Sequence, residues 1–283
     1  MHTTIVTTDT LAAYLNHPDW VVVDLRSSLA DPAYGRASYL AGHIPGAVYA
    51  DLNQDLSDPP GGGRGRHPLP PLEAFAERAG ALGISRSTQV VVYDDADSMY
   101  AARLWWMLRW AGHDAVAVLD GGFAKWTAEG REVRSGDEWR APATFAPSPR
   151  ADALVSADDV ERMRSDADRR LIDSRSPDRF RGENETIDPV AGHIPGARNY
   201  FFKNNMDESG AFRTAKDLRS RLLERLDGVE PSQAVFYCGS GVTACHNLLA
   251  MEIAGLSGAR LYAGSWSEWI SDPERPIATG EDG

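Results

Sequence analysis

The seven residues AGHIPGA at positions 41–47 occur again without change at positions 191–197. The blocks around them match in the same order in both halves of the chain. VVVDLRS (21–27) corresponds to RLIDSRS (170–176), VVVYDDADS (90–98) to AVFYCGSGV (234–242), and LDGGFAKW (119–126) to LYAGSWSEW (261–269). Because such ordered self-similarity is very improbable by chance, the sequence predicts two copies of one fold.

The two predicted domains are joined by residues 136–153. The stretch SGDEWRAPATFAPSPRAD (135–152) contains three prolines and has neither helical nor strand periodicity, which is typical of a linker. We therefore expect an N-terminal domain over residues 1–135 and a C-terminal domain over residues 154–283. A chain of 283 residues is long enough for two such domains.

Short apolar stretches alternate with longer amphipathic ones in each copy. In the first copy the apolar stretches are WVVVDLR (20–26), QVVVYD (89–94) and DAVAVLD (114–120), and the amphipathic ones include PLEAFAERAGALG (71–83) and ARLWWMLRWAG (102–112). This alternation predicts an α/β fold in which a mainly parallel sheet is flanked by helices. Functional groups in such sheets lie just beyond the carboxyl ends of the strands.

The composition restricts the classes of partner. The net charge is -12 and the basic residues are scattered among acidic ones, so we expect no nucleic acid as ligand. No stretch approaches the roughly 18 to 20 apolar residues that cross a bilayer, and the first residues lack a targeting pattern. We expect no membrane role and a cytoplasmic location. Two cysteines are too few for a disulfide scaffold or a four-cysteine zinc site. We expect no metal and no cofactor.

Cys238 follows the apolar stretch AVFY (234–237), and the turn CGSGVT (238–243) leads into a predicted helix. Glycines in such a turn can direct backbone N–H groups inward, and the helix adds the positive end of its dipole, so a thiolate would be stabilised there. The turn alone fits a nucleophile and a small buried cysteine equally well. The repeat favours the nucleophile, because the first copy has Asp94 at this position and lacks both glycines.

Cys245 is expected to have no chemical role. It lies seven residues after Cys238, which places it about two turns into the predicted helix, where a small residue facing the sheet is usual. His246 is adjacent to it but points in a different direction on a helix. The two residues therefore do not predict a zinc site.

Together these motifs resemble those of the tandem-domain rhodanese family, the thiosulfate and 3-mercaptopyruvate sulfurtransferases. The resemblance covers essentially the whole chain and is carried by the two GHIPGA blocks, the CGSGVTA loop, WWM at 105–107 and the GGFAKW/GSWSEW pair. It implies an inert first domain and a second domain whose Cys238 attacks a sulfur donor. The cysteine would hold the sulfur as a persulfide and pass it, with ping-pong kinetics, to cyanide or to a thiol such as thioredoxin or glutathione.

The resemblance also assigns roles to residues around the cysteine. Arg179 matches the arginine that binds the anionic end of the donor, and Ser240 and His67 match a proposed proton relay. The position of the relay's acid is Asn53, with Asp51 and Asp55 nearby. The remaining expected substrate contacts belong to the loop and to a segment of the first domain; they are Gly239, Gly241, Val242, Thr243 and Tyr100.

The loop CGSGVTA resembles that of 3-mercaptopyruvate enzymes, because thiosulfate-preferring relatives usually have basic residues where this chain has Gly239 and Ser240. We therefore expect 3-mercaptopyruvate as the donor, with thiosulfate as the alternative. Animal mercaptopyruvate enzymes carry a second arginine nine residues after the first, and Asp188 stands there in this chain. The glycine-rich stretch DPPGGGRGRHPLP (58–70) is expected to be a flexible loop. Two interpretations stay open: the loop borders the pocket through Arg64 or Arg66, or it is a mobile surface loop without a role in the site.

Two other functions stay open at this stage. Cysteine-dependent phosphatases and arsenate reductases share the rhodanese fold, but their usual C-x5-R pattern would need an arginine where this chain has Ala244. A non-catalytic rhodanese-like binding module is the other alternative, and the retention of Cys238 in a glycine-bearing loop disfavours it.

Overall fold

The computed structural model describes residues 1–281, which form two compact units. The first unit comprises Met1–Asp58, Leu69–Arg150 and Glu208–Phe212, and the second comprises Pro59–Pro68, Ala151–Asp207 and the described residues from Arg213 onward. Residues 136–150 of the predicted linker therefore group with the first unit, and Ala151–Ala153 forms a short 3₁₀ helix, η1, in the second. We retain 136–153 as the proposed connection between domains 1–135 and 154–283.

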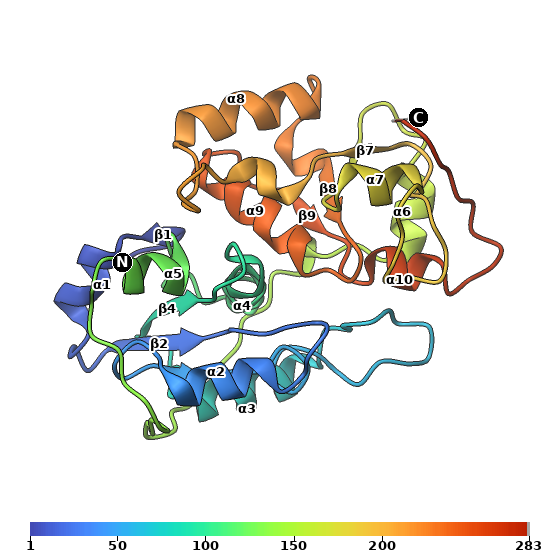
Figure 1. The fold of residues 1–283 in the computed structure, drawn as a ribbon. Helices are drawn as coiled ribbons and strands as arrows, with labels where there is room; N and C mark the ends of the chain where they lie inside the picture. The colour runs from blue at the N-terminus through green and yellow to red at the C-terminus, as the bar shows by residue number, and fades with distance from the viewer. Residues whose placement is uncertain (282–283) are drawn as a thin grey trace. The chain divides into compact units, whose positions relative to one another are not determined.

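Each unit contains one parallel sheet surrounded by helices, as Figure 1 shows. The elements of the first unit are β1 (Ile5–Val6), α1 (Thr8–Tyr14), β2 (Trp20–Asp24), α2 (Tyr34–Ala41), β3 (Val48–Tyr49), α3 (Leu72–Ala81), β4 (Gln89–Tyr93), α4 (Met99–Trp110), β5 (Val116–Leu119) and α5 (Gly122–Ala128). The strand order is β1-β5-β4-β2-β3, and every pairing is parallel.

The second unit repeats this plan. After η1 its elements are α6 (Ala157–Met163), β6 (Arg170–Asp173), α7 (Pro177–Arg181), β7 (Ala197–Asn199), η2 (Phe202–Asn205), α8 (Ala215–Leu226), η3 (Pro231–Gln233), β8 (Ala234–Tyr237), α9 (Thr243–Ile253), β9 (Arg260–Leu261) and α10 (Ser265–Trp269). The order β7-β6-β8-β9 is again wholly parallel. The predicted α/β fold with parallel sheets flanked by helices is confirmed.

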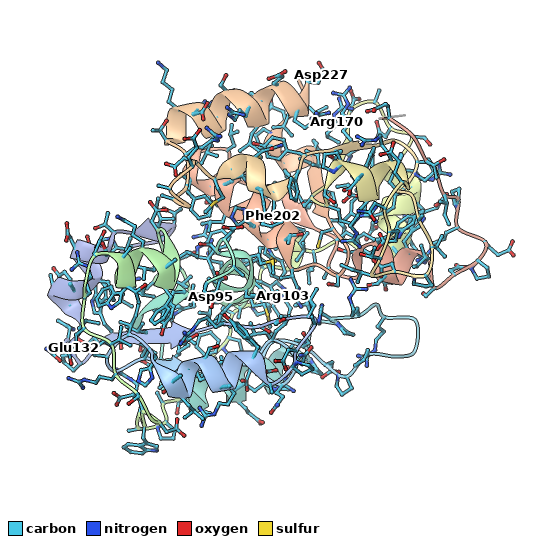
Figure 2. All side chains as sticks on the ribbon, viewed as in Figure 1. Asp95, Arg103, Glu132, Arg170, Phe202 and Asp227 are labelled. Atoms are coloured by element: carbon cyan, nitrogen blue, oxygen red, sulfur yellow. The ribbon has the colours of Figure 1, made fainter. Side chains whose placement is uncertain are left out.

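The cores follow from the apolar strands. All residues of β2 and β4 are buried, because a parallel strand covered on both faces has no solvent side. In the second unit α9 packs against β8, β9 and α8. Phe202, labelled in Figure 2, places its ring edge-on to His246 on α9, with ring centroids 5.3 Å apart. These contacts fix the start of α9 relative to the end of β8.

The repeated AGHIPGA block anchors a buried ion pair in each unit. In the first unit Arg26 binds Asp24 through Nε and Nη2 and also donates to the carbonyl oxygen of Gly42. In the second unit Arg175 binds Asp173 in the same way and donates to Gly192. Since an unpaired buried charge is costly, the Asp–Arg pair stabilises each unit, and the bond to the glycine carbonyl ties the block to it.

Candidate active site

Cys238 lies between the end of β8 and the start of α9. The cysteine is 2% exposed, and its Sγ accepts a hydrogen bond from the backbone N–H of Gly241 at 3.1 Å. α9 begins at Thr243, so the predicted strand, turn and helix occur where the sequence placed them. Val242 is the N-cap residue of α9, and the first N–H groups of a helix have no acceptor within it. The loop therefore concentrates positive partial charge near the sulfur.

Gly241 is required by the shape of this loop. Its φ is +76°, a region that favours glycine. A Cβ at this position would collide with the carbonyl oxygen of Ala263 and would lie 3.1 Å from the carbonyl carbon. The turn between β9 and α10 thus packs closely against the Cys238 loop. This contact fixes the position of the Gly241 N–H that donates to Cys238.

Ser265 supports the cysteine from α10, and sequence reasoning missed it. Its Oγ accepts a hydrogen bond from the N–H of Cys238 at 3.1 Å and donates to the carbonyl of Tyr262. Ser265 has φ +55°, whereas the equivalent position in the first unit is Gly122 with φ +57°. A serine in this conformation costs about 1 to 2 kcal/mol relative to glycine. The replacement of glycine by serine in the otherwise similar 119–126 and 261–269 blocks was the available signal.

Ser240 and His67, predicted as a relay, are brought together. Ser240 Oγ and His67 Nδ1 lie 2.8 Å apart, and both side chains are buried. His67 comes from Pro59–Pro68, which belongs to the second unit. Asn53 instead donates its backbone N–H to Asp51 in the first unit. The acid partner of the relay stays a prediction.

Arg179 lies on α7 and is bound by two buried carboxylates. Its Nε and Nη2 donate to Glu185, and Nη2 also donates to Asp188 at 3.0 Å. Burial would raise the pKa of Glu185, but hydrogen bonds from the N–H groups of Asp188 and Ile187 and from Arg179 hold it below its usual value. Arg179 is therefore part of an ion-pair network rather than a solvated loop charge.

Arg66 joins the same network. The sequence suggests that the 58–70 loop borders the pocket through Arg64 or Arg66. Its Nη1 donates to Asp188, and its Nη2 lies 3.0 Å from the position that a Cβ on Gly239 would take. Arg179 Nη2 lies 3.6 Å from the same point. Two guanidinium groups therefore border the residue that follows Cys238.

The remaining predicted residues have contacts of their own. Tyr100 is in the first unit, at the start of α4, and its N–H donates to Asp94. Burial raises the pKa of its hydroxyl to about 12. Thr243 is the first residue of α9. The assignment of Tyr100, Gly239, Gly241, Val242 and Thr243 to substrate contacts stays a prediction.

Cys245 differs from expectation in its place on the helix. Because α9 begins at Thr243, Cys245 lies in the first turn rather than about two turns into the helix. Its Sγ donates to the carbonyl of Gly241 at 3.2 Å, and it is a free cysteine, as is Cys238. Within residues 1–281 no group of three or more His, Cys, Asp or Glu side chains is arranged to hold a metal ion. No helix in the same range is long and apolar enough to cross a membrane.

The first unit carries Asp94 where the second carries Cys238. One carboxylate oxygen of Asp94 accepts hydrogen bonds from the N–H groups of Ala96 and Ser98, and the other accepts from Tyr100 and Ala101. Burial raises the pKa of Asp94 to about 6 against the opposing effect of these four bonds. The equivalent turn of the first unit thus holds an internal anion.

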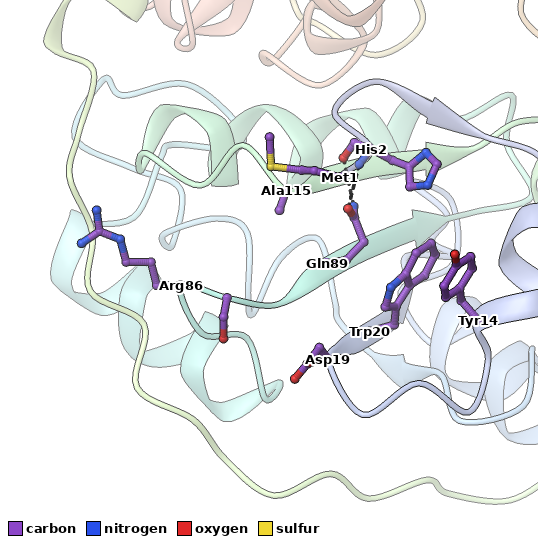
Figure 3. A pocket seen from close by; sticks show the side chains of 9 residues that line it. Met1, His2, Tyr14, Asp19, Trp20, Arg86, Gln89 and Ala115 are labelled. Carbon is purple, nitrogen blue, oxygen red and sulfur yellow. Dashed lines mark hydrogen bonds between the residues drawn. The ribbon is translucent and has the colours of Figure 1, made fainter.

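A cavity of about 430 Å³ also occurs in the first unit (Figure 3). Its lining includes Trp20 and Gln89, the first residues of β2 and β4, and His2 and Gln89 are joined by two hydrogen bonds. These strand starts are at the edge opposite to the carboxyl ends, where parallel sheets place their functional groups. We therefore centre the candidate site on Cys238.

Comparison with known proteins agrees with this architecture. The family sequence model of the rhodanese-like domain matches this chain twice, over residues 7–129 and 156–272. A probable 3-mercaptopyruvate sulfurtransferase of Pseudomonas aeruginosa is 47% identical over 279 residues, which is 98% of each chain. The thiosulfate sulfurtransferase of Bos taurus is 36% identical over 88% of this chain and 84% of its own.

Solved structures give the same result. The crystal structure of SseA from Escherichia coli, a 3-mercaptopyruvate sulfotransferase with the rhodanese fold, superposes with a TM-score of 0.82. The identity is 32%, and the match covers 94% of this chain and all of SseA. The chain therefore belongs to the rhodanese-like family and contains two rhodanese-like domains.

Proposed function

We propose that this protein is a sulfurtransferase that moves a sulfur atom from 3-mercaptopyruvate to cyanide or a thiol, with the sulfur held in between as the sulfane sulfur of a persulfide on Cys238. The observation that carries the proposal is the hydrogen bond from the Gly241 N–H to Cys238 Sγ, at the start of α9. A thiolate and a persulfide are both anions at the same place, so one set of backbone donors stabilises the nucleophile and the intermediate. Two relatives named as sulfurtransferases, one for each donor, support this class of reaction.

The reaction divides into two half-reactions. The Cys238 thiolate attacks the sulfur of 3-mercaptopyruvate, so an S–S bond forms and the C–S bond breaks. The electron pair of the C–S bond leaves on carbon as the enolate of pyruvate, which takes up a proton. Cyanide or a thiolate then attacks the outer sulfur, and the S–S electron pair returns to Cys238. This sequence predicts ping-pong kinetics.

Ser240 and His67 supply a route for the proton. Ser240 is two residues from the nucleophile in the chain, and its Oγ lies 2.8 Å from Nδ1 of His67. Protonation of the enolate carbon demands an acid, whereas sulfite leaves thiosulfate without one. The buried pair therefore favours 3-mercaptopyruvate as the first choice of donor, and thiosulfate remains the alternative.

Arg179 is proposed to bind the carboxylate of the donor, because guanidinium groups match carboxylates geometrically. Gly239, Gly241, Val242 and Thr243 are proposed to surround the transferred sulfur, and Tyr100 is kept as a further proposed substrate contact. Thioredoxin or glutathione is the proposed thiol acceptor, and the proposed location is the cytoplasm.

Thiocyanate formation tests the activity. The wild-type protein with cyanide and either donor is expected to produce thiocyanate, Cys238→Ser is expected to abolish the product, and Cys245→Ser is expected to retain it. A folded wild-type protein that forms no thiocyanate from either donor would refute the proposal. The ratio of kcat/KM for 3-mercaptopyruvate and thiosulfate then decides the donor, and a ratio that favours thiosulfate would overturn the first choice.

Phosphatase or arsenate reductase activity is the weaker enzymatic alternative. Ala244 occupies the position where phosphoryl chemistry needs an arginine, and it is fully buried at the start of α9. Phosphate release from an aryl phosphate, lost in Cys238→Ser, would favour this alternative. A non-catalytic binding module would form no persulfide with either donor.

A further inference from the structure

Asp188 joins two arginines that come from distant parts of the chain. Its side chain is 2% exposed, and its two carboxylate oxygens bind Arg66 from the Pro59–Pro68 segment and Arg179 from α7. A buried carboxylate between two guanidinium groups holds both in a defined position. Arg66 is therefore a fixed part of the site in the second unit.

The hydrogen-bonding groups of Arg179 are largely used within the protein. Its Nε–Nη2 edge, which can bind a carboxylate through two parallel bonds, is occupied by Glu185, and Asp188 takes a further bond from Nη2. Within residues 1–281 no acceptor is bound to Nη1. Arg179 by itself thus offers a donor's carboxylate a single nitrogen.

Arg66 has the opposite pattern. Its Nη1 is held by Asp188, whereas its Nε is buried and has no partner in the described part of the chain. Its Nη2 lies beside Gly239, 3.0 Å from where a Cβ would be. A buried N–H without a partner is costly, so an acceptor at this edge would be favoured. The unused edge of Arg66 adjoins the residue next to Cys238.

The segment that carries Arg66 is fixed to the second unit. The N–H of Arg66 donates to Ser267 Oγ at 3.0 Å, and Ser271 donates to the carbonyl of Gly63 at 3.2 Å. His67, the next residue, binds Ser240. The glycine-rich stretch is thus anchored at its carboxyl end, and little ordering remains to be done when a ligand binds.

We propose that Arg66 is a donor-binding residue of this sulfurtransferase. Its Nε–Nη2 edge binds the carboxylate of the α-keto acid donor beside Cys238, and Asp188 holds the guanidinium in place through Nη1. Arg179 adds a second positive group to the same carboxylate. The inference rests on the proposed function, and it makes the 59–68 segment a part of the donor-binding site.

The test measures binding separately from turnover. 3-Hydroxypyruvate has the carboxylate of the donor but carries oxygen in place of the transferable sulfur, so calorimetry gives its affinity without any reaction. Arg66→Ala is expected to weaken this binding roughly 10- to 100-fold, the range for loss of a charge-assisted hydrogen-bond pair. Arg66→Lys keeps the charge without the fork and is expected to fall between Arg66→Ala and wild type.

The controls separate a binding role from a structural one. Arg64 is an exposed arginine in the same segment, and Arg64→Ala is expected to leave the affinity within twofold of wild type. Single-turnover loading of Cys238 with 3-mercaptopyruvate is expected to slow in Arg66→Ala at low donor concentration, while transfer from a preformed persulfide to cyanide is unchanged. A melting temperature equal to that of wild type confirms that the variant is folded.

The outcomes distinguish the two levels of the proposal. Equal 3-hydroxypyruvate affinities for wild type, Arg66→Ala and Arg64→Ala would overturn the role of Arg66, even with full sulfurtransferase activity. A wild-type protein that acquires no sulfur on Cys238 from either donor would overturn the proposed function instead. Asp188→Asn provides a second variant: release of Arg66 is expected to raise the KM for 3-mercaptopyruvate with little change in kcat, and an unchanged KM would contradict the positioning role of Asp188.

Discussion

Replacement of Gly241 by alanine tests whether the loop around Cys238 is held rigidly by its neighbours. The alanine would have to adopt φ +76°, and its Cβ would collide with the carbonyl of Ala263. The left-handed conformation costs about 1 to 2 kcal/mol, and the displacement of a packed backbone adds about 1 to 3 kcal/mol. We therefore expect the free energy of unfolding to fall by about 2 to 5 kcal/mol, or the melting temperature by roughly 6 to 15 °C.

Gly228→Ala is the matched control. Gly228 has φ +80°, but a Cβ there would meet no atom within 4 Å. This variant keeps the conformational cost and lacks the collision, so its loss should stay near about 1 to 2 kcal/mol. The difference between the two losses in free energy of unfolding measures the cost of the collision with the Ala263 turn.

The activity of the Gly241 variant is the second measurement. Movement of the loop would shift the N–H that donates to Cys238 Sγ, and we expect the rate of sulfur loading to fall roughly tenfold or more. Loading would be followed in single turnovers by mass spectrometry of the persulfide. If Gly241→Ala loses no more stability than Gly228→Ala and loads sulfur at the wild-type rate, the reasoning about this loop is refuted.

Three further predictions concern the relay, the first unit and a buried ion pair. Ser240→Ala removes the hydroxyl that contacts Nδ1 of His67 and should lower kcat with 3-mercaptopyruvate more than with thiosulfate; equal losses in the steady-state assay would contradict the proton role. Because the pKa of Asp94 is about 6 in the folded chain, above its unfolded value, this group stabilises the folded state at low pH and loses that contribution as pH rises from about 4 to about 6. Asp94→Asn should remove this part of the pH dependence of urea unfolding, and a wild-type minus variant difference that is constant from pH 4 to 7 would contradict it. Asp173→Asn leaves the buried Arg175 without its bidentate partner and should cost about 3 to 5 kcal/mol in denaturant unfolding; a loss below about 1 kcal/mol would contradict the stated role of the pair.

An exposed ion pair provides the control for Asp173→Asn. Arg36 and Asp137 are bonded on the surface of the first unit, with 44% and 61% of their side chains exposed. Solvent screens such a pair, so Arg36→Ala should change stability by less than about 1 kcal/mol. The comparison isolates the effect of burial from that of charge pairing.

The sequence predicted the fold well because its strongest signals are local and repeated. The valine-rich stretch 20–26 contains β2, the stretch 89–94 contains β4, and AVFY is the whole of β8. Burial on both faces of a parallel strand produces such continuous apolar runs. The same regularity placed Cys238 at the carboxyl end of a strand before any contact was known.

The site was predicted less completely, because its other members meet through irregular loops. Arg66 and Asp188 are 122 positions apart, and no periodicity or propensity links two such residues. Asp188 was noted as the place of a missing arginine, yet its role as a bridge between two arginines depends on the path of the 59–68 segment. Ser265 was missed because its conformation is set by the contact with Cys238 rather than by its own preference.

The two equivalent turns explain in physical terms why the first domain would be inert. In the first unit the carboxylate of Asp94 accepts four backbone hydrogen bonds and fills the anion position of the turn. In the second unit the shorter side chain of Cys238 places a single sulfur there, bonded to the N–H of Gly241. Both turns stabilise negative charge, but a buried carboxylate has no atom to accept a transferred sulfur, whereas a thiolate forms an S–S bond and remains an anion in the same field. The chemistry therefore depends on which anion the chain itself places at the end of the strand.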